Sequence, residues 1–395
     1  MRIVLFYTGV DSFNYYIDEL SKEFIRRNHE IFILDLQNPP NDHPHSYHYF
    51  TEFLKQKVDM AVTYDGFGIK DDLFIELWNE LDVPVVNILV DHPLRFHPTM
   101  KNHPRRYMQF CCDRNHVAYV KKYFSESVKN VAFMPHAGAL PQEEGFIPYG
   151  ERKYEILFSG TYYTPEHEFH RLEEYLPEEN VLYPFYRTMA DYMIAHSSET
   201  TEQAVLATIQ QTGLQVTDSQ LLTILRCSEP LDWMVRMYYR EQVVKTLADA
   251  GLDIWLLGRG WENHPSSHLP NVHRIDDRVS FAQTLPYMAD ARINLNVMPW
   301  FKDGTHERIF NIFLQHSLPL TDYSRWVDEN FQIGEEIAVY QLEALEQLPE
   351  LAGELLADKA KAEEMIAKGY EKTRKNYTWA NCVDQIIGTM EKEKV

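Results

Sequence analysis

The chain lacks any uninterrupted apolar stretch near the roughly 20 residues that a membrane-spanning helix needs. The first apolar run, in MRIVLFYTGVDS, is too short for a signal-peptide core and is followed by Asp11. Cysteine is scarce, and the few cysteines show neither a CxxC spacing nor a disulfide framework, which is typical of a reducing compartment. We therefore expect a cytoplasmic protein without a membrane span.

Basic residues are few relative to acidic ones. The 38 Lys and Arg residues stand against 59 Asp and Glu residues, which gives a formal net charge of -21 at pH 7. An acidic chain repels the phosphate backbone of nucleic acids, so the composition argues against a nucleic-acid partner. Any anionic ligand must therefore be bound by a local cluster of cationic groups.

Common cofactor and metal motifs are also missing. Neither a GxGxxG fingerprint nor a GxxxxGK[ST] loop follows a predicted strand, which disfavours an NAD enzyme and a P-loop enzyme. The run DHPHSYHYF contains His43, His45 and His48, but no cysteine or carboxylate stands at a firm ligand spacing, so we do not interpret it as a zinc site. We expect no metal and no cofactor.

Short apolar strands alternate with helical patterns through the first part of the chain. At 395 residues the chain suits two domains of ordinary size. The alternation predicts a parallel sheet covered on both faces by helices, and hence a Rossmann-like domain over residues 1–140. The predicted strands lie in RIVLFY, HEIFILDL, DMAVTYD, VPVVNILVD, RRYMQFCC and KNVAFMPHAG.

A second series of strands follows the polar connection AGALPQEEGFIPYGERK and predicts a second Rossmann-like α/β domain over residues 151–377. About 90 residues separate its first two strands, more than one crossover helix needs, so we interpret about 165–230 as a helical insertion. An amphipathic helix over about 378–395 is expected to pack back on the first domain. The second series of strands lies in YEILFSG, LDIWLLGRG, NVHRID, ARINLNVMP, LPLTD and IAVY.

A polar cluster, DGTHERIFN at 303–311, stands where a loop is predicted to enter a buried helix. The first backbone N–H groups of a helix lack internal partners and attract anions. Gly304 permits close approach, Thr305 is suited to the N-cap position, and Arg308, with His306, could bind phosphate. The alternative is a capped helix in which Glu307 and Arg308 only pair with neighbours.

Other polar residues follow predicted strands, and ligands of open α/β sheets bind beyond the carboxyl ends of strands, here in an expected cleft between the domains. Each has a structural alternative: Gly160 and Tyr162 in FSGTYY suit a tight turn, and Asp322 could cap the next helix. Arg259 and Trp261 in GRGW are further candidates for binding a phosphate or a base. In the first domain Asp91 and His92 suit a general base, although Asp91 could be a turn residue before Pro93.

These segments resemble the CgeB-like bacterial glycosyltransferases, which have the GT-B fold. The resemblance lies in LLGRGW, in the segment from LPYMADARINLNVMPW through DGTHERIFN to LPLTD and IAVY, and in NILVDHPLRF, CCDRNHVAYVKKYF and NVAFMPHAG. It covers most of the chain except the insertion. Asn311 departs from the wider GT-B pattern, in which many relatives have a glutamate that binds the donor ribose.

The resemblance implies transfer of a sugar from a nucleoside diphosphate sugar, without a catalytic metal. The second domain would bind this donor, with Arg308 stabilising the leaving diphosphate, and the first would bind an acceptor that is a protein, a polysaccharide or another glycan. The alternatives are a nucleotide-sugar epimerase or hydrolase on the same fold, and a non-catalytic surface-coat assembly protein. His306, Glu307 and Arg308 argue against the last, because an inactive site need not keep them.

Overall fold

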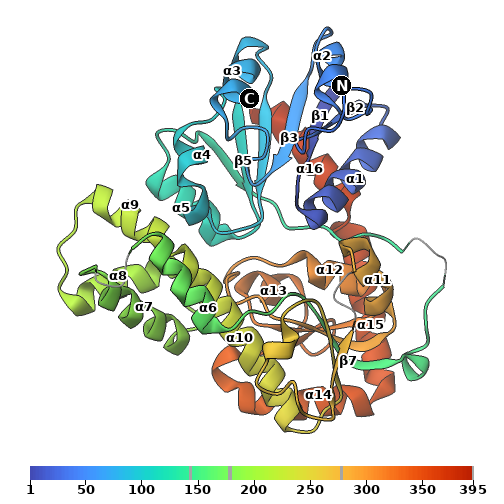
Figure 1. Ribbon diagram of the computed structural model, residues 1–395. Coiled ribbons are helices and arrows are strands. Elements are labelled where there is room, and N and C mark those ends of the chain that lie inside the picture. Colours follow the sequence, from blue (N-terminus) through green and yellow to red (C-terminus); the bar gives the residue numbers. More distant parts are fainter. Residues whose placement is uncertain (142–144, 177–179, 276–278, 394–395) are drawn as a thin grey trace. The chain divides into compact units, whose positions relative to one another are not determined.

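The computed structural model describes residues 1–141, 145–176, 180–275 and 279–393, and divides into two compact units (Figure 1). Unit 1 comprises Met1–Ala139, Ser280–Ala282 and Asn376–Val395, and unit 2 comprises Leu140–Val279 and Gln283–Lys375. Parts of four predicted segments lie outside the described residues, namely 142–144 of the connection, 177–179 of the insertion, Asp276 of NVHRID and 394–395 of the last helix.

Unit 1 is built on a six-stranded parallel sheet with the strand order β2-β1-β3-β4-β5-β6. All residues of β3, β4 and β5 are buried, as expected for a sheet covered on both faces. The chain order reverses between β1 and β3, which makes their carboxyl ends the switch point where such sheets bind ligands. The strands are β1 (Arg2–Tyr7), β2 (Glu30–Asp35), β3 (Met60–Tyr64), β4 (Val85–Leu89), β5 (Tyr107–Cys111) and β6 (Asn130–Phe133).

Helices from both ends of the chain cover this sheet (Figure 1). The last helix, α16 (Trp379–Glu393), packs beside α1 (Asp11–Arg26), where Arg27 Nη2 lies 2.8 Å from Asp384 Oδ1. Helices follow the strands as the helical patterns predicted. Two short helices, η1 (Pro93–Phe96) and α4 (His97–Lys101), were not predicted, because they lie in the proline-containing stretch PLRFHP. The remaining helices are α2 (Tyr47–Phe53), α3 (Asp72–Glu80) and α5 (Arg114–Tyr123).

Unit 2 has a second six-stranded parallel sheet, in the order β12-β11-β10-β7-β8-β9. Its chain order reverses between the neighbouring strands β7 and β10, so its switch point lies at their carboxyl ends. The strands are β7 (Tyr154–Ser159), β8 (Ile254–Leu257), β9 (Val272–Ile275), β10 (Ala291–Asn296), β11 (Leu318–Asp322) and β12 (Ala338–Tyr340). The α/β fold class expected from the sequence is confirmed.

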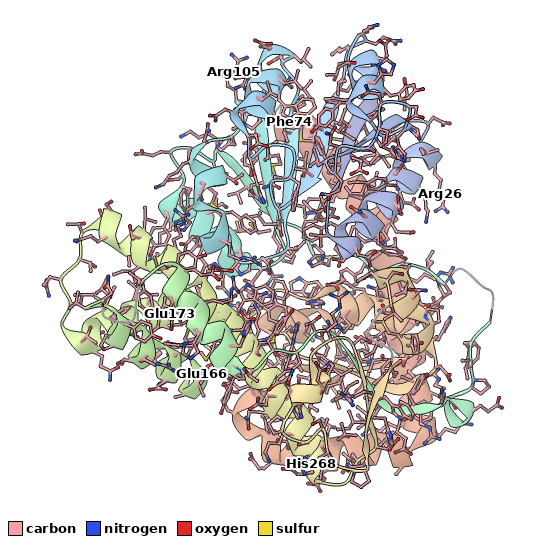
Figure 2. All side chains as sticks on the ribbon, viewed as in Figure 1. Arg26, Phe74, Arg105, Glu166, Glu173 and His268 are labelled. Carbon is pink, nitrogen blue, oxygen red and sulfur yellow. The ribbon has the colours of Figure 1, made fainter. Side chains whose placement is uncertain are left out.

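The insertion is helical, and Figure 1 shows α7, α8 and α9 grouped together. Its polar interruption SSETTEQ contains a capping box, in which the Thr200 side chain accepts from Gln203 N and Gln203 Oε1 accepts from Thr200 N. Glu166, labelled in Figure 2, lies 2.8 Å from Arg187. The helices are α6 (Pro165–His170), η3 (Arg171–Glu174), α7 (Tyr183–Ala195), α8 (Thr201–Thr212) and α9 (Asp218–Cys227).

Helices pack against the sheet of unit 2 and against one another. All residues of α12 (Glu307–Leu314) are buried, and Phe313 reaches α15 (Lys359–Asn376) at Gly369, where an added Cβ would lie 2.1 Å from the ring. Burying one such phenylalanine contributes about 1.5 to 3 kcal/mol. The other elements are η2 (Tyr149–Glu151), α10 (Glu229–Asp249), η4 (Trp261–Asn263), α11 (Phe281–Ala289), α13 (Arg325–Asn330), η5 (Leu342–Gln347) and α14 (Leu348–Ala357).

Candidate nucleotide-sugar site

The loop before α12 enters the helix one residue later than expected. His306, not Thr305, is the N-cap, because its backbone is extended and its side chain accepts from Arg308 N at 3.2 Å. Thr305 is buried, and its hydroxyl lies 3.4 Å from the His306 carbonyl oxygen. Gly304 is buried too, and its carbonyl oxygen accepts from Ser324 Oγ at 2.7 Å. The loop is therefore tied to the residue that caps the next helix.

The imidazole of His306 is shared between two partners. Its Nδ1 lies 3.2 Å from Arg308 N and 2.6 Å from Glu307 Oε2. An unprotonated Nδ1 accepts from the amide, whereas a protonated Nδ1 donates to the carboxylate, so the protonation of one atom decides which contact forms. The first turn of α12 thus carries a carboxylate, an imidazole and a guanidinium within consecutive residues.

Arg308 reaches the switch point between β7 and β10. Its Nη1 donates to Asn296 Oδ1 at 2.8 Å, at the end of β10, and its guanidinium carbon lies 5.4 Å from the centroid of the Phe158 ring in β7. A Cβ on Gly160 would lie 3.5 Å from Arg308 Nη2. The Arg308 side chain is buried, and the ends of β7 and β10 together with α12 set its orientation.

Two further buried arginines come from α10, a helix from which the sequence analysis took no site candidate. Arg240 lies on the same phenylalanine as Arg308, 5.8 Å from the Phe158 centroid, and its Nη1 donates to Thr161 O at 2.6 Å. Arg236 lies 4.1 Å from the Trp300 centroid and 2.6 Å from Asp232 Oδ2. Burial, followed by the charges of Arg308 and Arg236, lowers the pKa of Arg240 to about 9.

This cluster of Arg236, Arg240 and Arg308, the arginine cluster, was missed because cationic residues on a helix are usually solvated. A signal was present nonetheless. Asp232, Arg236 and Arg240 recur at a spacing of four residues, which places them on one face of a helix that is rich in buried apolar residues. A charged stripe on an otherwise buried helix indicates ionic contacts inside the unit.

The two aromatic candidates, Tyr162 of FSGTYY and Trp261 of GRGW, are buried inside unit 2. Tyr162 is fully buried and its hydroxyl donates to Glu241, while Trp261 stacks on Tyr162 and donates from Nε1 to Gly160 O at 2.8 Å. Both side chains therefore support the loop backbone rather than lining its surface. Arg259 differs from them, because it is exposed beyond the end of β8.

The glycines of the GRG turn are required by close backbone contacts. A Cβ on Gly260, whose φ is +84°, would lie 1.9 Å from Tyr162 O, and one on Gly258 would lie 2.3 Å from Gly160 O. The two loops that follow β7 and β8 are consequently packed backbone to backbone. This contact fixes the Gly160 loop on which the arginine cluster rests.

Asp322 ends β11 and lines a pocket at the same edge of the sheet. Its Oδ1 accepts from Met298 N at 2.8 Å, and its buried Oδ2 has no hydrogen-bond partner in the described part of the chain. Burial raises its pKa to about 7. Ser324, rather than Asp322, caps α13. The pocket, of about 60 Å³, is lined in part by Asp322, Lys302, Tyr323 and Glu343, and by Ser197 of the insertion.

In unit 1 the two base candidates already have neighbours. Asp91 forms an ion pair with Arg95, and His92 caps η1 by accepting from Leu94 N at Nδ1, 3.1 Å away. The sequence did not single out Asp65, which directly follows β3 at the switch point of unit 1 and accepts from Val90 N at 3.1 Å. Burial, followed by the charge of Asp91, raises the pKa of Asp65 to about 7.

Solved structures with the same fold identify the architecture. The chain resembles sucrose-phosphate synthase from Thermosynechococcus elongatus (TM-score 0.58, 11% identity, 100% of this chain and 98% of that one). It also resembles an α-glucosyltransferase in complex with UDP (0.54, 12%, 99% and 100%) and Anabaena Alr3699/HepE in complex with UDP and glucose (0.52, 8%, 99% and 99%). The fold is GT-B.

The sequence itself matches a family model over part of this GT-B chain. Residues 239–388 match the family described as glycosyl transferase-like, a range that includes α12 and the strands from β8 to β12. No curated protein sequence matches the chain. In the described part of the chain, no helix is both long and apolar enough to cross a membrane.

Arg240 and Arg308 of the arginine cluster lie inside the segment that the family model covers, whereas Arg236 precedes it. The family match lies mainly in unit 2 and the arginine cluster lies wholly in it, whereas the GT-B fold describes the whole chain. Among the predicted donor residues, unit 2 brings Gly160 and Arg308 together, and Asn296 links Arg308 to Thr321, the residue before Asp322. Tyr162 and Trp261 lie beneath the loops and support them.

Proposed function

We propose that the chain is a glycosyltransferase whose unit 2 binds a nucleoside diphosphate sugar. The observation that carries the proposal is the convergence of Arg240 and Arg308 on Phe158, at the carboxyl end of β7. Buried guanidinium groups repel one another in the low dielectric of an interior, and a diphosphate would relieve that repulsion. The match of residues 239–388 to the glycosyl transferase-like family supports this choice of ligand.

The proposed donor site has a distinct part for each part of the donor. Arg308, Arg240 and the first backbone N–H groups of α12 would bind the diphosphate, since guanidinium groups and helix N-termini both suit phosphate oxygens. Arg259, exposed beyond the end of β8, would contact the nucleoside, and Asp322, at the end of β11 on the other side of the diphosphate, would contact the sugar. Asn311, which is buried in α12, replaces the glutamate of many relatives and leaves an amide to bond a ribose hydroxyl.

The proposed reaction transfers the sugar to a hydroxyl group. The acceptor oxygen forms a bond to the anomeric carbon while the bond from that carbon to the β-phosphate oxygen breaks, and the nucleoside diphosphate leaves with the bonding electrons. Arg308 would stabilise the charge that develops on the leaving oxygen, an effect worth about 2.7 to 4 kcal/mol for one such donor in other enzymes. The hydroxyl proton passes to a base.

We propose that unit 1 binds the acceptor and supplies that base. Asp91 and His92 remain candidates, and Asp65 joins them, because a carboxyl with a raised pKa is a better proton acceptor than an ordinary one. The finer relationship to the CgeB-like group, the use of no metal and a cytoplasmic location are part of the same proposal. The acceptor is a protein, a polysaccharide or another glycan.

Calorimetric titration with UDP, GDP, TDP and CDP tests the donor site. We expect one nucleotide to bind the wild-type chain, with affinity lowered about tenfold or more in Arg308→Gln and in Arg240→Gln. Arg325→Gln is the matched control, because Arg325 belongs to unit 2 but its side chain is 70% exposed. Binding that is equal in Arg308→Gln and wild type would sink the proposed donor site.

Turnover separates the proposed transferase from its alternatives. A transferase releases nucleoside diphosphate rapidly only when an acceptor is present, whereas a nucleotide-sugar hydrolase releases it alone and an epimerase converts the sugar without releasing it. Absence of binding by every nucleoside diphosphate would favour a non-catalytic assembly protein. The glucose conjugates of the same four nucleotides are the substrates for measuring both the release of nucleoside diphosphate and the conversion of the sugar.

A further inference from the structure

A second cationic site lies in unit 1, separate from the arginine cluster. Its pocket, of about 390 Å³, follows the carboxyl ends of β3 and β4 and is lined by Lys70, Arg95, Phe96, Pro98, Thr99 and Asn102. The volume is within the usual range of small-molecule sites. Two of the residues that line this pocket, Lys70 and Arg95, are cationic in a chain with a net charge of -21.

The Lys70 ammonium group is held over apolar rings. Its Nζ lies 4.3 Å from the centroid of Phe67 and 6.0 Å from that of Phe96. Lys70 is an exposed residue, so its ammonium group is accessible to an anion that enters the pocket.

Arg95 brings the second cation from η1, the short helix that follows β4. Its guanidinium carbon lies 5.9 Å from the Phe96 centroid and its Nη1 binds the Asp91 carboxylate, which orients the planar group. Around the pocket, Thr99 adds a hydroxyl and Asn102 an amide, whose Nδ2 donates to Asp72 Oδ1 at 2.9 Å. A lysine, an arginine, a hydroxyl and an amide are the groups that oxyanions prefer.

The loop that carries Lys70 is fixed by its backbone. Gly66 N donates to Asn87 Oδ1 at 2.8 Å, and Gly66 and Gly68 both adopt positive φ, at +76° and +75°. A Cβ on Gly68 would lie 2.6 Å from the Phe6 ring, and one on Gly66 would lie 3.2 Å from Thr99 Cγ2. The pocket is therefore preorganised, which lowers the entropy lost on binding.

We propose that this pocket, the Lys70–Arg95 pocket, binds an oxyanion group, a phosphate or a carboxylate, on the acceptor of the transfer reaction. The assignment to the acceptor rests on the proposed function, while the binding of the oxyanion does not. The substrate class is then an anionic sugar or glycan, such as a sugar phosphate or a uronic acid. An uncharged sugar lacks the group that the pocket recognises.

Calorimetric titration of the full chain with inorganic phosphate, glucose 6-phosphate, glucuronate and glucose tests the proposal. We expect at least one anionic probe to bind while glucose does not, and its affinity to fall about tenfold or more in Lys70→Gln and in Arg95→Gln. Lys70→Arg keeps the positive charge, so we expect this variant to bind the anionic probe as the wild-type chain does. Lys57→Gln is the control, because Lys57 belongs to unit 1 and its side chain is 88% exposed.

The Arg308→Gln variant separates this proposal from the donor site. Anion binding that survives in Arg308→Gln but is lost in Lys70→Gln supports the Lys70–Arg95 pocket. Anion binding lost only in Arg308→Gln would assign the anion to unit 2 and overturn the pocket, as would a wild-type chain that binds no anionic probe. Nucleotide binding is measured on the same samples, so a failure of the donor site is recognised by itself.

Discussion

Arg308 Nη1 donates to Asn296 Oδ1 at 2.8 Å, and this bond joins the first turn of α12 to the end of β10. Asn296 also donates from Nδ2 to Thr321 Oγ1 at 2.9 Å, which extends the connection to β11. One buried amide thus orients the guanidinium group at the switch point and ties it to the strand that ends in Asp322. The amide is neutral, so it positions the cation without cancelling its charge.

Replacing the Asn296 amide by a carboxylate keeps a partner that orients Arg308 but neutralises the charge of its guanidinium group. In Asn296→Asp the carboxylate would pair with Arg308 and compete with a diphosphate, so we expect nucleotide affinity to fall about tenfold or more. Calorimetry measures the affinity, and denaturant unfolding shows whether the fold is kept. Asn330→Asp serves as the control, because the Asn330 amide lies on α13 and donates to Trp326 O. Unchanged affinity in a folded Asn296→Asp variant would contradict the role of the pair.

Arg240 offers a test of whether the arginine cluster exists for a ligand. The cation costs stability, since burial and two neighbouring cations lower its pKa and its Nε has no hydrogen-bond partner among the described residues. We therefore expect Arg240→Met to melt no lower than the wild-type chain without ligand, while its nucleotide affinity falls about tenfold or more. A thermal melt with and without nucleotide measures both. A lower Tm with undiminished affinity would make Arg240 structural.

The strands of both sheets were predictable because a strand buried on two faces is a short apolar run bounded by polar or turn residues. The segment RIVLFY forms the strand Arg2–Tyr7, and ARINLNVMP contains the strand Ala291–Asn296. The boundaries of helices were less accessible. Thr305 and His306 both precede an apolar helix, and only the folded loop, in which Thr305 is buried, decides which of them caps it.

The arginine cluster and Asp65 show what the sequence could not provide. Arg240 stands about 70 residues before Arg308, and their proximity depends on the order in which β7 and β10 pair within the sheet. Asp65 resembles a turn residue in DGFG, and only the pairing of β3 with β4 buries it under the Val90 amide. Both sites depend on how the strands pair within their sheets.

The buried carboxyl of Asp322 should make stability depend on pH. Its pKa is raised to about 7 in the folded chain but stays near 3.9 in the unfolded chain, so the folded state binds the extra proton between these values. Stability from this group is complete below about pH 4 and is lost as the pH rises towards 7. We expect Asp322→Asn to gain about 1 to 3 kcal/mol relative to wild type between pH 5 and pH 8.

Urea unfolding at the two pH values measures this difference, and the exposed Asp42 supplies the control variant Asp42→Asn. Because the comparison is made between variants at each pH, other titrating groups cancel. A difference between Asp322→Asn and wild type that stays constant from pH 5 to pH 8 would show that the carboxyl does not take up a proton on folding. The same comparison applies to Asp65→Asn in unit 1, whose pKa is raised in the same direction.

Transfer activity should not require a divalent cation. A metal ion in a nucleotide-sugar enzyme neutralises the leaving diphosphate, and in the proposed donor site the buried Arg308 and Arg240 would supply that positive charge instead. We expect the rate of nucleoside diphosphate release with acceptor to be the same in EDTA as in Mg²⁺, and to fall in Arg308→Gln under both conditions. Activity that disappears in EDTA and returns with Mg²⁺ or Mn²⁺ would mean that the guanidinium groups do not supply the charge that the leaving group needs.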